Sequence, residues 1–195
     1  PEAYGGSGLG VYEASIIMEE VCRAGAHAGA CHAQMYVMGS VLRHGSEAQK
    51  QYYLPKIAAG ELRLQSFGVT EPTTGTDTTS LKTTARLDGD HYVVNGQKVW
   101  TTGAHLASFG LITVRTNPDL PKHQGITCMV VDMHAEGVEI RPLRMVNGGA
   151  EFNEVFFNDV FVPDDDVVGP VDGGWTVARG TLGNESVSIG SGDGQ

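Results

Sequence analysis

The sequence predicts an α+β protein in which helices come first, a β region follows, and a further helix begins near the end of the chain. Apolar residues repeat at a helical spacing before about residue 64 and at a strand spacing after it. Runs of helices followed by runs of strands indicate separate layers or domains, not alternating β/α units. We therefore expect a helical domain over residues 1–64, a β domain over residues 65–168, and the start of a second helical domain over residues 169–195.

Three helices are expected in the first part of the chain. An apolar stripe marks the first of them between residues 11 and 22. The second is expected over residues 28–44, with Gly45 ending it in the left-handed conformation. Ser46 has a Gln three residues later, which is typical of the capping box that opens a helix. Pro55 is expected to interrupt this third helix because proline lacks a backbone N–H.

The second part of the chain contains short runs of strand-forming residues. We interpret these runs as strands at Arg63–Val69, Leu81–Leu87, His91–Val94, Lys98–Thr102, Phe109–Arg115, Ile126–Asp132, Val138–Arg141 and Glu154–Val162. Asp88-Gly89-Asp90 and Asn95-Gly96 are typical of hairpin turns, in which glycine supplies the positive φ. Short strands at this spacing predict an antiparallel sandwich or an open barrel. The last helix is expected to run from near Gly173 to about Ile189.

Composition excludes several classes of function. The chain has 13 Lys+Arg against 23 Asp+Glu, and this acidic balance argues against a nucleic-acid-binding surface. No apolar run approaches the ~20 residues of a membrane span, and the first residues do not resemble a signal peptide. No P-loop, zinc or calcium motif is present, so we expect no metal. Cys22, Cys31 and Cys128 lack CxxC spacing and are expected to be buried, reduced thiols.

Two polar segments are the candidate binding elements. The first, Phe67–Asp77, is a strand that ends in Thr-Glu-Pro and continues into a turn rich in threonine. Hydroxyls and free backbone N–H groups at a strand end can hold a polar ring or a phosphate, although such a loop can also satisfy its own backbone. The second, Lys98–His105, places Trp100 beside Thr101 and Thr102. This combination suits a planar ring with polar edges, whereas a tryptophan alone is more often a core residue.

Together these two segments carry a resemblance. The FGVTEP strand with its GTD turn, followed by NGQKVWTTGAH, resembles the middle domain of the acyl-CoA dehydrogenases. The opening PEAYGGSGLG, the run FNEVFFNDVFVP and the helix start GGWTVARGTLGNES are similar to the same family in the same order. The resemblance implies an FAD enzyme with N-terminal helices, a β domain and a C-terminal four-helix bundle. This sequence would then hold the later part of the first domain, all of the second, and the start of the bundle.

The resemblance also implies roles for individual residues. The positions that match flavin-binding residues are Phe67, Gly68, Val69, Thr70, Gly75, Thr76, Trp100, Thr101 and Thr102. Trp100 would pack against the isoalloxazine ring, and Thr101 and Thr102 would bond its N5 and O4 edge. Thr76 stands where the family usually has Ser, at the boundary between flavin and substrate, and it keeps the hydroxyl.

The implied reaction is α,β-dehydrogenation of an acyl-CoA thioester to the trans-2-enoyl-CoA, as in fatty-acid β-oxidation. A carboxylate removes the α-proton while the β-hydrogen leaves as hydride to flavin N5, and the electrons pass to an electron-transfer flavoprotein. In most members the base would lie beyond Gln195, but in a minority it lies where Glu185 stands. Ser186 replaces the arginine that usually follows.

The resemblance further implies an oligomer, usually a tetramer, of identical or related subunits in the bacterial cytoplasm or the mitochondrial matrix. Two alternatives remain open. One is a flavin oxidase or monooxygenase of the same fold, whose reduced flavin would be reoxidised rapidly by air. The other is a non-catalytic subunit of a mixed acyl-CoA dehydrogenase oligomer, which would bind flavin only together with its partner, or not at all.

Overall fold

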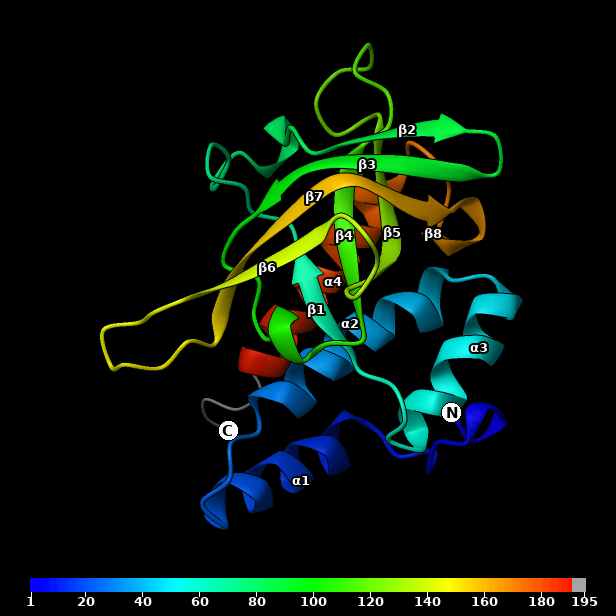
Figure 1. The fold of residues 1–195 in the computed structure, drawn as a ribbon. Helices are drawn as coiled ribbons and strands as arrows, with labels where there is room; N and C mark the ends of the chain where they lie inside the picture. Colours follow the sequence, from blue (N-terminus) through cyan, green and yellow to red (C-terminus); the bar gives the residue numbers. More distant parts are fainter. Residues whose placement is uncertain (191–195) are drawn as a thin grey trace.

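A computed structural model describes residues 1–190, with side chains described for residues 1–183. The helices before the sheet are η1 (Glu2–Tyr4), α1 (Val11–Arg23), α2 (Gly29–His44) and α3 (Glu47–Ala58), and α4 (Gly174–Gly190) follows it (Figure 1). The strands are β1 (Leu64–Gly68), β2 (Thr84–Asp88), β3 (His91–Lys98), β4 (Phe109–Arg115), β5 (Ile126–Asp132), β6 (Val138–Leu143), β7 (Phe152–Pro163) and β8 (Val167–Val168). Their connections contain η2 (Thr78–Ser80), η3 (Ala104–Leu106) and η4 (Asp164–Asp166). The predicted order of helices, β domain and a further helix is confirmed.

The strands form one sheet that doubles back on itself. Their hydrogen-bonded order is β6-β7-β3-β2-β4-β5-β8, and β1 lies beside β4. The two halves of the sheet are joined between β2 and β4 by the single pair Thr84–Arg115, so β3 and β7 cross over β4 and β5 (Figure 1). Most pairings are antiparallel, as expected, but β1 and β2 each run parallel to β4.

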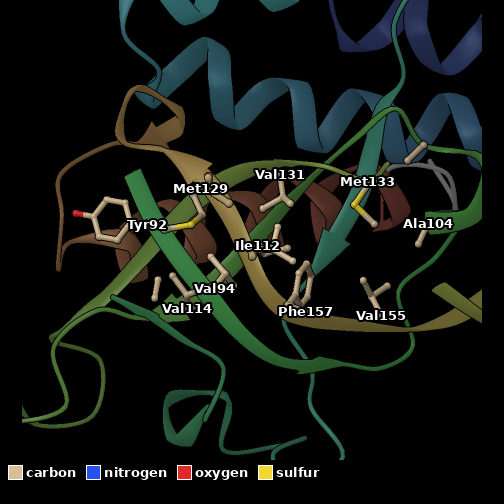
Figure 2. Packing of buried hydrophobic residues seen from close by; sticks show 14 residues of the cluster. Tyr92, Val94, Ala104, Ile112, Val114, Met129, Val131, Met133, Val155 and Phe157 are labelled. Atoms are coloured by element: carbon tan, nitrogen blue, oxygen red, sulfur yellow. The ribbon is translucent and has the colours of Figure 1, made fainter. Parts of the chain in front are cut away.

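Two hydrophobic cores follow from the alternation of side chains along the central strands. On β4 and β5, Ile112, Met129 and Val131 face the other half of the sheet, where Phe157 of β7 packs against them (Figure 2). Alternate residues of the same strands, among them Leu111, face the helices. There they contact a second cluster that includes Val37, Val41, Val177 and Ala178 of α2 and α4. The sheet is thus covered on one side by its own second half and on the other by helices.

Two details of the helices differ from the prediction. Gly45 is extended, with φ −69° and ψ 154°, and not left-handed, because the N-cap Ser46 of α3 follows it directly. Its close approach to the Val41 carbonyl, which a Cβ would meet at 2.5 Å, explains the glycine instead. Pro55 lies inside α3 without ending it. Proline has no N–H to donate to the Gln51 carbonyl, four residues earlier in the helix. Gln51 is exposed, so water can bond this carbonyl instead.

The expected hairpin at Asn95-Gly96 is wrong, because β3 runs through this dipeptide as one strand. A register shift against β7 occurs here, and Gly96 has φ +148°. Asn95 joins the bulge to β7, because its side-chain amide donates to Asp159 Oδ1 at 2.8 Å. The backbone of Thr83 lies so close that a Cβ on Gly96 would meet its Cα at 2.6 Å. The glycine therefore serves a bulge and a close approach, not a turn.

The cysteines differ among themselves. Cys22 and Cys31 are exposed, contrary to prediction, because α1 and the start of α2 turn those positions away from the described core. Cys128 is buried as predicted, and its thiol donates to the Gly174 carbonyl at 3.2 Å. Burial raises the pKa of the Cys128 thiol to about 12. Cys128 therefore stays protonated and unreactive at neutral pH.

Gly96→Ala is expected to lower the free energy of unfolding by about 2–4 kcal/mol. An alanine is strained at a positive φ, and its Cβ would also clash with Thr83. Gly89→Ala is the matched control, because Gly89 also has positive φ but no atom within 4 Å of an added Cβ. The control should lose only about 1–2 kcal/mol. Chemical denaturation measures both values, and equal losses would contradict the assigned role of the Thr83 contact.

Candidate functional site

The structure brings the two candidate segments side by side. Thr70 follows the end of β1, and its carbonyl accepts a hydrogen bond from Val99 N at 2.9 Å, just after β3. The backbone of β1 lies close to β3 as well, because a Cβ on Gly68 would meet Lys98 Cγ at 3.1 Å. Segments far apart in the sequence therefore form one continuous surface at the ends of two strands.

Trp100 is the most exposed aromatic residue of this surface. The residue is 59% exposed, and Phe152 packs against its ring in a T-shaped contact with 6.1 Å between the ring centroids. Its backbone is left-handed, with φ 60°, which is unusual for a bulky residue. Such a conformation persists only where the surrounding structure over-determines it, and such residues cluster at functional sites. Trp100 thus presents a flat apolar face at a fixed position.

The residue after Trp100 is fixed to the start of β7. Thr101 N donates to the Asn153 carbonyl at 3.0 Å, and Asn153 N donates back to the Thr101 carbonyl at 3.1 Å. The Asn153 side chain, which is fully buried, adds a further hydrogen bond to the Thr101 carbonyl at 2.9 Å. These three bonds hold the backbone next to Trp100 and maintain its left-handed turn.

The two threonines after Trp100 have different surroundings. Thr101 is buried, and its hydroxyl has no hydrogen-bond partner among the described residues. Thr102 is half-buried and lines a cavity of about 240 Å³. Of the two predicted flavin contacts, Thr102 is therefore the one whose side chain borders open space.

The threonine-rich turn forms some of its hydrogen bonds within itself. Glu71 and Thr74 exchange backbone hydrogen bonds at 3.2 and 3.1 Å, and the Asp77 carboxylate accepts bonds from Thr79 and Ser80 at 2.6 Å each. The Thr74 hydroxyl is buried without a partner among the described residues, like that of Thr101. A bound group that reached either hydroxyl would remove a cost of about 1–3 kcal/mol. Each of the two candidate segments thus contains one buried threonine hydroxyl without a partner among the described residues.

The other predicted flavin-binding residues occupy the same end of the sheet. Phe67 is half-buried against the helix-side core, and Val69 is buried beyond the end of β1. Gly75 and Thr76 are exposed, and an added Cβ on Gly75 would meet no atom within 4 Å. The open space at Gly75 leaves room for a group that is not part of this chain.

A cavity beside Thr102 was not predicted from the sequence. It is mostly apolar, and its walls come from the start of α2, from β1 and from η3 with its flanking residues. The lining residues are His27, Gly29, Ala30, Ala33, Gln65, Thr102, Gly103, His105, Leu106 and Glu151. The small residues Gly29, Ala30 and Ala33 share one side of α2. This group of small residues is the feature of the sequence that could have indicated the cavity. Their short side chains leave space on that side of the cavity.

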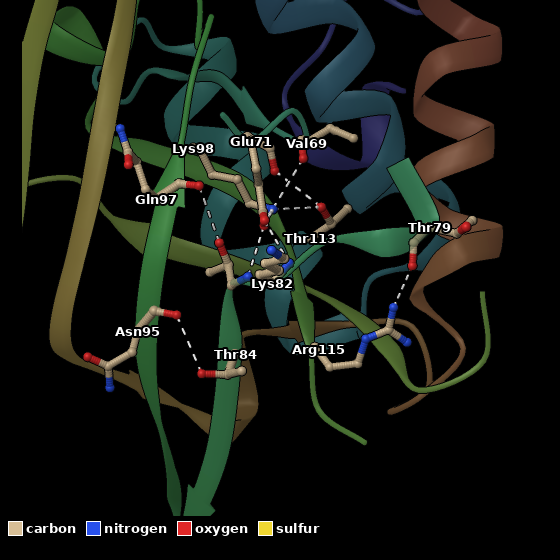
Figure 3. A network of polar contacts seen from close by, with 12 residues as sticks. Val69, Glu71, Thr79, Lys82, Thr84, Asn95, Gln97, Lys98, Thr113 and Arg115 are labelled. Carbon is tan, nitrogen blue, oxygen red and sulfur yellow. Dashed lines mark hydrogen bonds and ion pairs between the residues drawn. The ribbon is translucent and has the colours of Figure 1, made fainter. Parts of the chain in front are cut away.

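A buried ion pair was also missed. Lys98 and Glu71 have side chains that are 0% and 3% exposed, and Lys98 Nζ lies 2.8 Å from Glu71 Oε1 (Figure 3). Burial alone would raise the pKa of Glu71, but the Lys98 ammonium and several hydrogen-bond donors outweigh it and hold that pKa below its usual value. Burial lowers the pKa of Lys98, and Glu71 counteracts this effect.

Three further findings concern the Glu185 position, metal-binding groups and membrane-spanning helices. Glu185 lies on α4, but its side chain falls outside the described residues. Where the structure is described, no group of three or more His, Cys, Asp or Glu side chains could hold a metal ion. No helix of the described chain is long and apolar enough to cross a bilayer.

Comparisons with known proteins agree with this arrangement. The model of the acyl-CoA dehydrogenase N-terminal domain matches residues 1–61, and that of the acyl-CoA dehydrogenase middle domain matches residues 66–160. Acyl-CoA dehydrogenase FadE29 of Mycobacterium tuberculosis is 44% identical over 191 residues, which are 97% of this chain and 49% of FadE29. The chain thus spans about half the length of this curated relative.

Two solved structures share the fold. The Tcur3481-Tcur3483 steroid ACAD superposes with a TM-score of 0.89 at 35% identity, over 98% of this chain and 49% of that one. The ChsE4-ChsE5 complex from Mycobacterium tuberculosis gives a TM-score of 0.82 at 37% identity, over 94% of this chain and 47% of that one. The ordered motifs, the fold and the matched domains agree, and the chain belongs to the acyl-CoA dehydrogenase family, of which it carries the N-terminal and middle domains.

Proposed function

We propose that the whole protein containing this chain is an FAD-dependent acyl-CoA dehydrogenase. It would convert an acyl-CoA thioester to the trans-2-enoyl-CoA and pass the electrons to an electron-transfer flavoprotein. The observation that supports this most is the Val99–Thr70 hydrogen bond, because it joins the two candidate flavin-binding segments beside the cavity at Thr102. Flavin content of the purified protein tests the proposal, and a wild-type protein that neither contains nor takes up FAD would contradict it.

The residues of this chain would divide the work as follows. The face of Trp100 would stack on the planar ring, and Thr70 and Thr102 would offer hydrogen bonds to its polar edge. Gly75 lets the backbone approach the ring closely, and Thr76 contacts flavin and substrate with its hydroxyl. Bound FAD would supply the hydride acceptor. Glu185 on α4 is the proposed base for the α-proton.

We further propose that the acyl group is bulky and enters the cavity beside Thr102. The small residues Gly29, Ala30 and Ala33 support this idea because they leave that wall of the cavity wide. The similarity to a protein described as a steroid ACAD supports it as well. A straight, short acyl chain would leave much of the 240 Å³ cavity unfilled.

Ala30→Leu is expected to lower kcat/KM for a cyclic, steroid-type acyl-CoA roughly 10- to 100-fold, because pocket contacts of one to a few methylenes discriminate by this much. Ala30 is exposed on α2, so the added methyl groups fill the cavity without disturbing the core. The rate with a short straight-chain acyl-CoA should change little. Ala48→Leu, an exposed site near the start of α3, is the matched control. Equal losses with both substrates would contradict the assignment of this cavity.

We also propose that this chain works in a mixed oligomer with a related subunit. The supporting observation is its similarity to a solved complex of two proteins, ChsE4 and ChsE5. Native mass spectrometry of the protein, expressed alone and together with a related subunit, tests this proposal. A homo-oligomer with full flavin content in the absence of the second subunit would contradict it and would also exclude the non-catalytic alternative.

A flavin oxidase remains the alternative within the same fold. It is distinguished by the fate of the reduced flavin after substrate has been added. A dehydrogenase should stay reduced in air for much longer than an oxidase and should be reoxidised when an electron-transfer flavoprotein is added. Reoxidation by air within a catalytic turnover would replace the dehydrogenase proposal.

A further inference from the structure

We propose that the buried Lys98–Glu71 pair is a positioning device for the flavin site. Neither side chain reaches the surface formed by the two segments, so neither is a catalytic residue. Their role is to fix the segment that carries Thr70 relative to the segment that carries Trp100. This inference rests on the proposed function, since it concerns how the same site is held ready for its flavin.

The ammonium group of Lys98 connects three different parts of the chain. Its Nζ donates to the Val69 carbonyl at 3.2 Å, to Glu71 Oε1 at 2.8 Å and to Thr113 Oγ1 at 3.3 Å (Figure 3). These acceptors belong to the residue that follows β1, to the turn after it, and to β4. A lysine ammonium has three protons, and each of them has a partner here. The group is therefore satisfied although it is 0% exposed.

The carboxylate of Glu71 extends the connection to the segment that enters β2. Its Oε2 accepts a hydrogen bond from Lys82 N at 2.6 Å, and its Oε1 accepts one from Thr83 N at 2.9 Å. Thr83 is the residue that packs against the bulge at Gly96 in β3. The ion pair thus joins the turn at Glu71 to β4, through Thr113, and to the segment that enters β2, through Lys82 and Thr83.

The pair lies directly behind the candidate flavin surface. Glu71 follows Thr70, and Lys98 precedes Trp100 by only one intervening residue, Val99. Val99 N itself bonds the Thr70 carbonyl at 2.9 Å. A movement of either charged side chain would therefore shift the carbonyl of Thr70 or the left-handed backbone of Trp100. Catalytic and binding geometry is lost when such supporting contacts loosen by about 1 Å.

Folding stability alone does not account for an ion pair at this position. Removing two charges from water is costly, and uncharged replacements of a whole buried pair are often neutral or stabilising. Removal of one partner alone is different, because it leaves a buried charge uncompensated and strongly destabilises the fold. A variant that changes both residues together therefore separates the positioning role from the contribution to stability.

The test compares the wild-type protein with the double variant Lys98→Met, Glu71→Gln. Glutamine keeps an acceptor oxygen for one of the two backbone N–H groups that the Glu71 carboxylate bonds, and methionine keeps most of the lysine stem. FAD affinity is measured by titrating the apoprotein, flavin geometry by visible circular dichroism, and stability by thermal unfolding of the apoprotein. We expect at least a tenfold rise in the FAD dissociation constant and an altered flavin dichroism, with a Tm close to that of the wild type.

Tyr53→Phe is the matched control for a purely structural defect. It removes a partly buried hydrogen bond to Asp166 Oδ1, 2.6 Å long, which joins α3 to η4 and involves no residue of the two candidate segments. This variant should lose stability but keep the wild-type FAD affinity and dichroism. Glu71→Gln alone leaves the buried Lys98 ammonium without its carboxylate, so it should lower the Tm below that of the double variant and weaken FAD binding at least as much.

The outcomes separate the two proposals. Wild-type FAD affinity and dichroism in a folded double variant would overturn the positioning role and leave the proposed function intact. Equal weakening of FAD binding by Tyr53→Phe would also overturn it, because the effect would then follow general stability. A wild-type protein that binds no FAD would overturn the proposed function and, with it, this inference.

Discussion

Trp100→Ala is expected to weaken FAD binding roughly 10- to 100-fold, because stacking of a planar ring on an aromatic side chain contributes about 1–3 kcal/mol. The wild-type side chain is 59% exposed, so little folding stability depends on it. Flavin content after purification and titration of the apoprotein with FAD measure the effect. The thermal stability of the apoprotein should change little, which separates loss of binding from loss of fold.

Two further variants make this result specific. Trp100→Phe keeps an aromatic face and should retain most of the FAD affinity. Phe161→Ala removes a comparably exposed aromatic residue, 62% exposed on β7, whose ring contacts His91. It should leave the flavin content unchanged. Wild-type FAD affinity in Trp100→Ala, or an equal loss in Phe161→Ala, would count against the stacking role of Trp100.

Glu185→Gln in the whole protein is expected to slow dehydrogenation by about 10²–10⁴-fold, because an amide cannot accept the α-proton. FAD affinity should remain at the wild-type value, since the proposed role concerns the substrate and not the cofactor. Stopped-flow measurement of flavin bleaching by acyl-CoA gives the rate. Exchange of the substrate α-proton with deuterated water reports the proton transfer separately, and both should fall together.

The control for Glu185 is an exposed carboxylate away from the candidate site. Glu136→Gln removes one negative charge at the surface and should leave bleaching and exchange unchanged. A Glu185→Gln variant that bleaches its flavin at the wild-type rate would assign the base to another carboxylate. The first family position to examine would then be the more common one, beyond Gln195.

Features that depend on local sequence were predictable. The capping box of α3 is an example, because Gln49 N donates to Ser46 Oγ at 3.1 Å and Ser46 N donates to Gln49 Oε1 at 2.9 Å. The strands β4 and β5 were predicted with their observed bounds, since both are continuous apolar runs. The two polar segments were also identified from their residue types, although only the structure shows the hydrogen bond between Thr70 and Val99.

Features that depend on distant contacts were missed. Asn95-Gly96 has the composition of a hairpin turn, but the bulge there is set by Thr83 and Asp159 on other strands. Lys98 and Glu71 are 27 positions apart, and no local pattern indicates that a lysine in a strand will be fully buried. The cavity beside Thr102 draws its walls from α2, β1, the residues around η3, and Glu151 just before β7. Their approach follows from the packing of α2 on the sheet, which spacing alone does not specify.

The most direct test of the proposed site is an anaerobic titration of the flavin-loaded protein with acyl-CoA thioesters of different size. Bleaching of the oxidised flavin band, with a trans-2-enoyl-CoA as the product, is the predicted result, and cyclic acyl groups should react faster than short straight ones. An FAD band that no acyl-CoA in the series bleaches, in a protein assembled with its partner subunits, would contradict the proposed function.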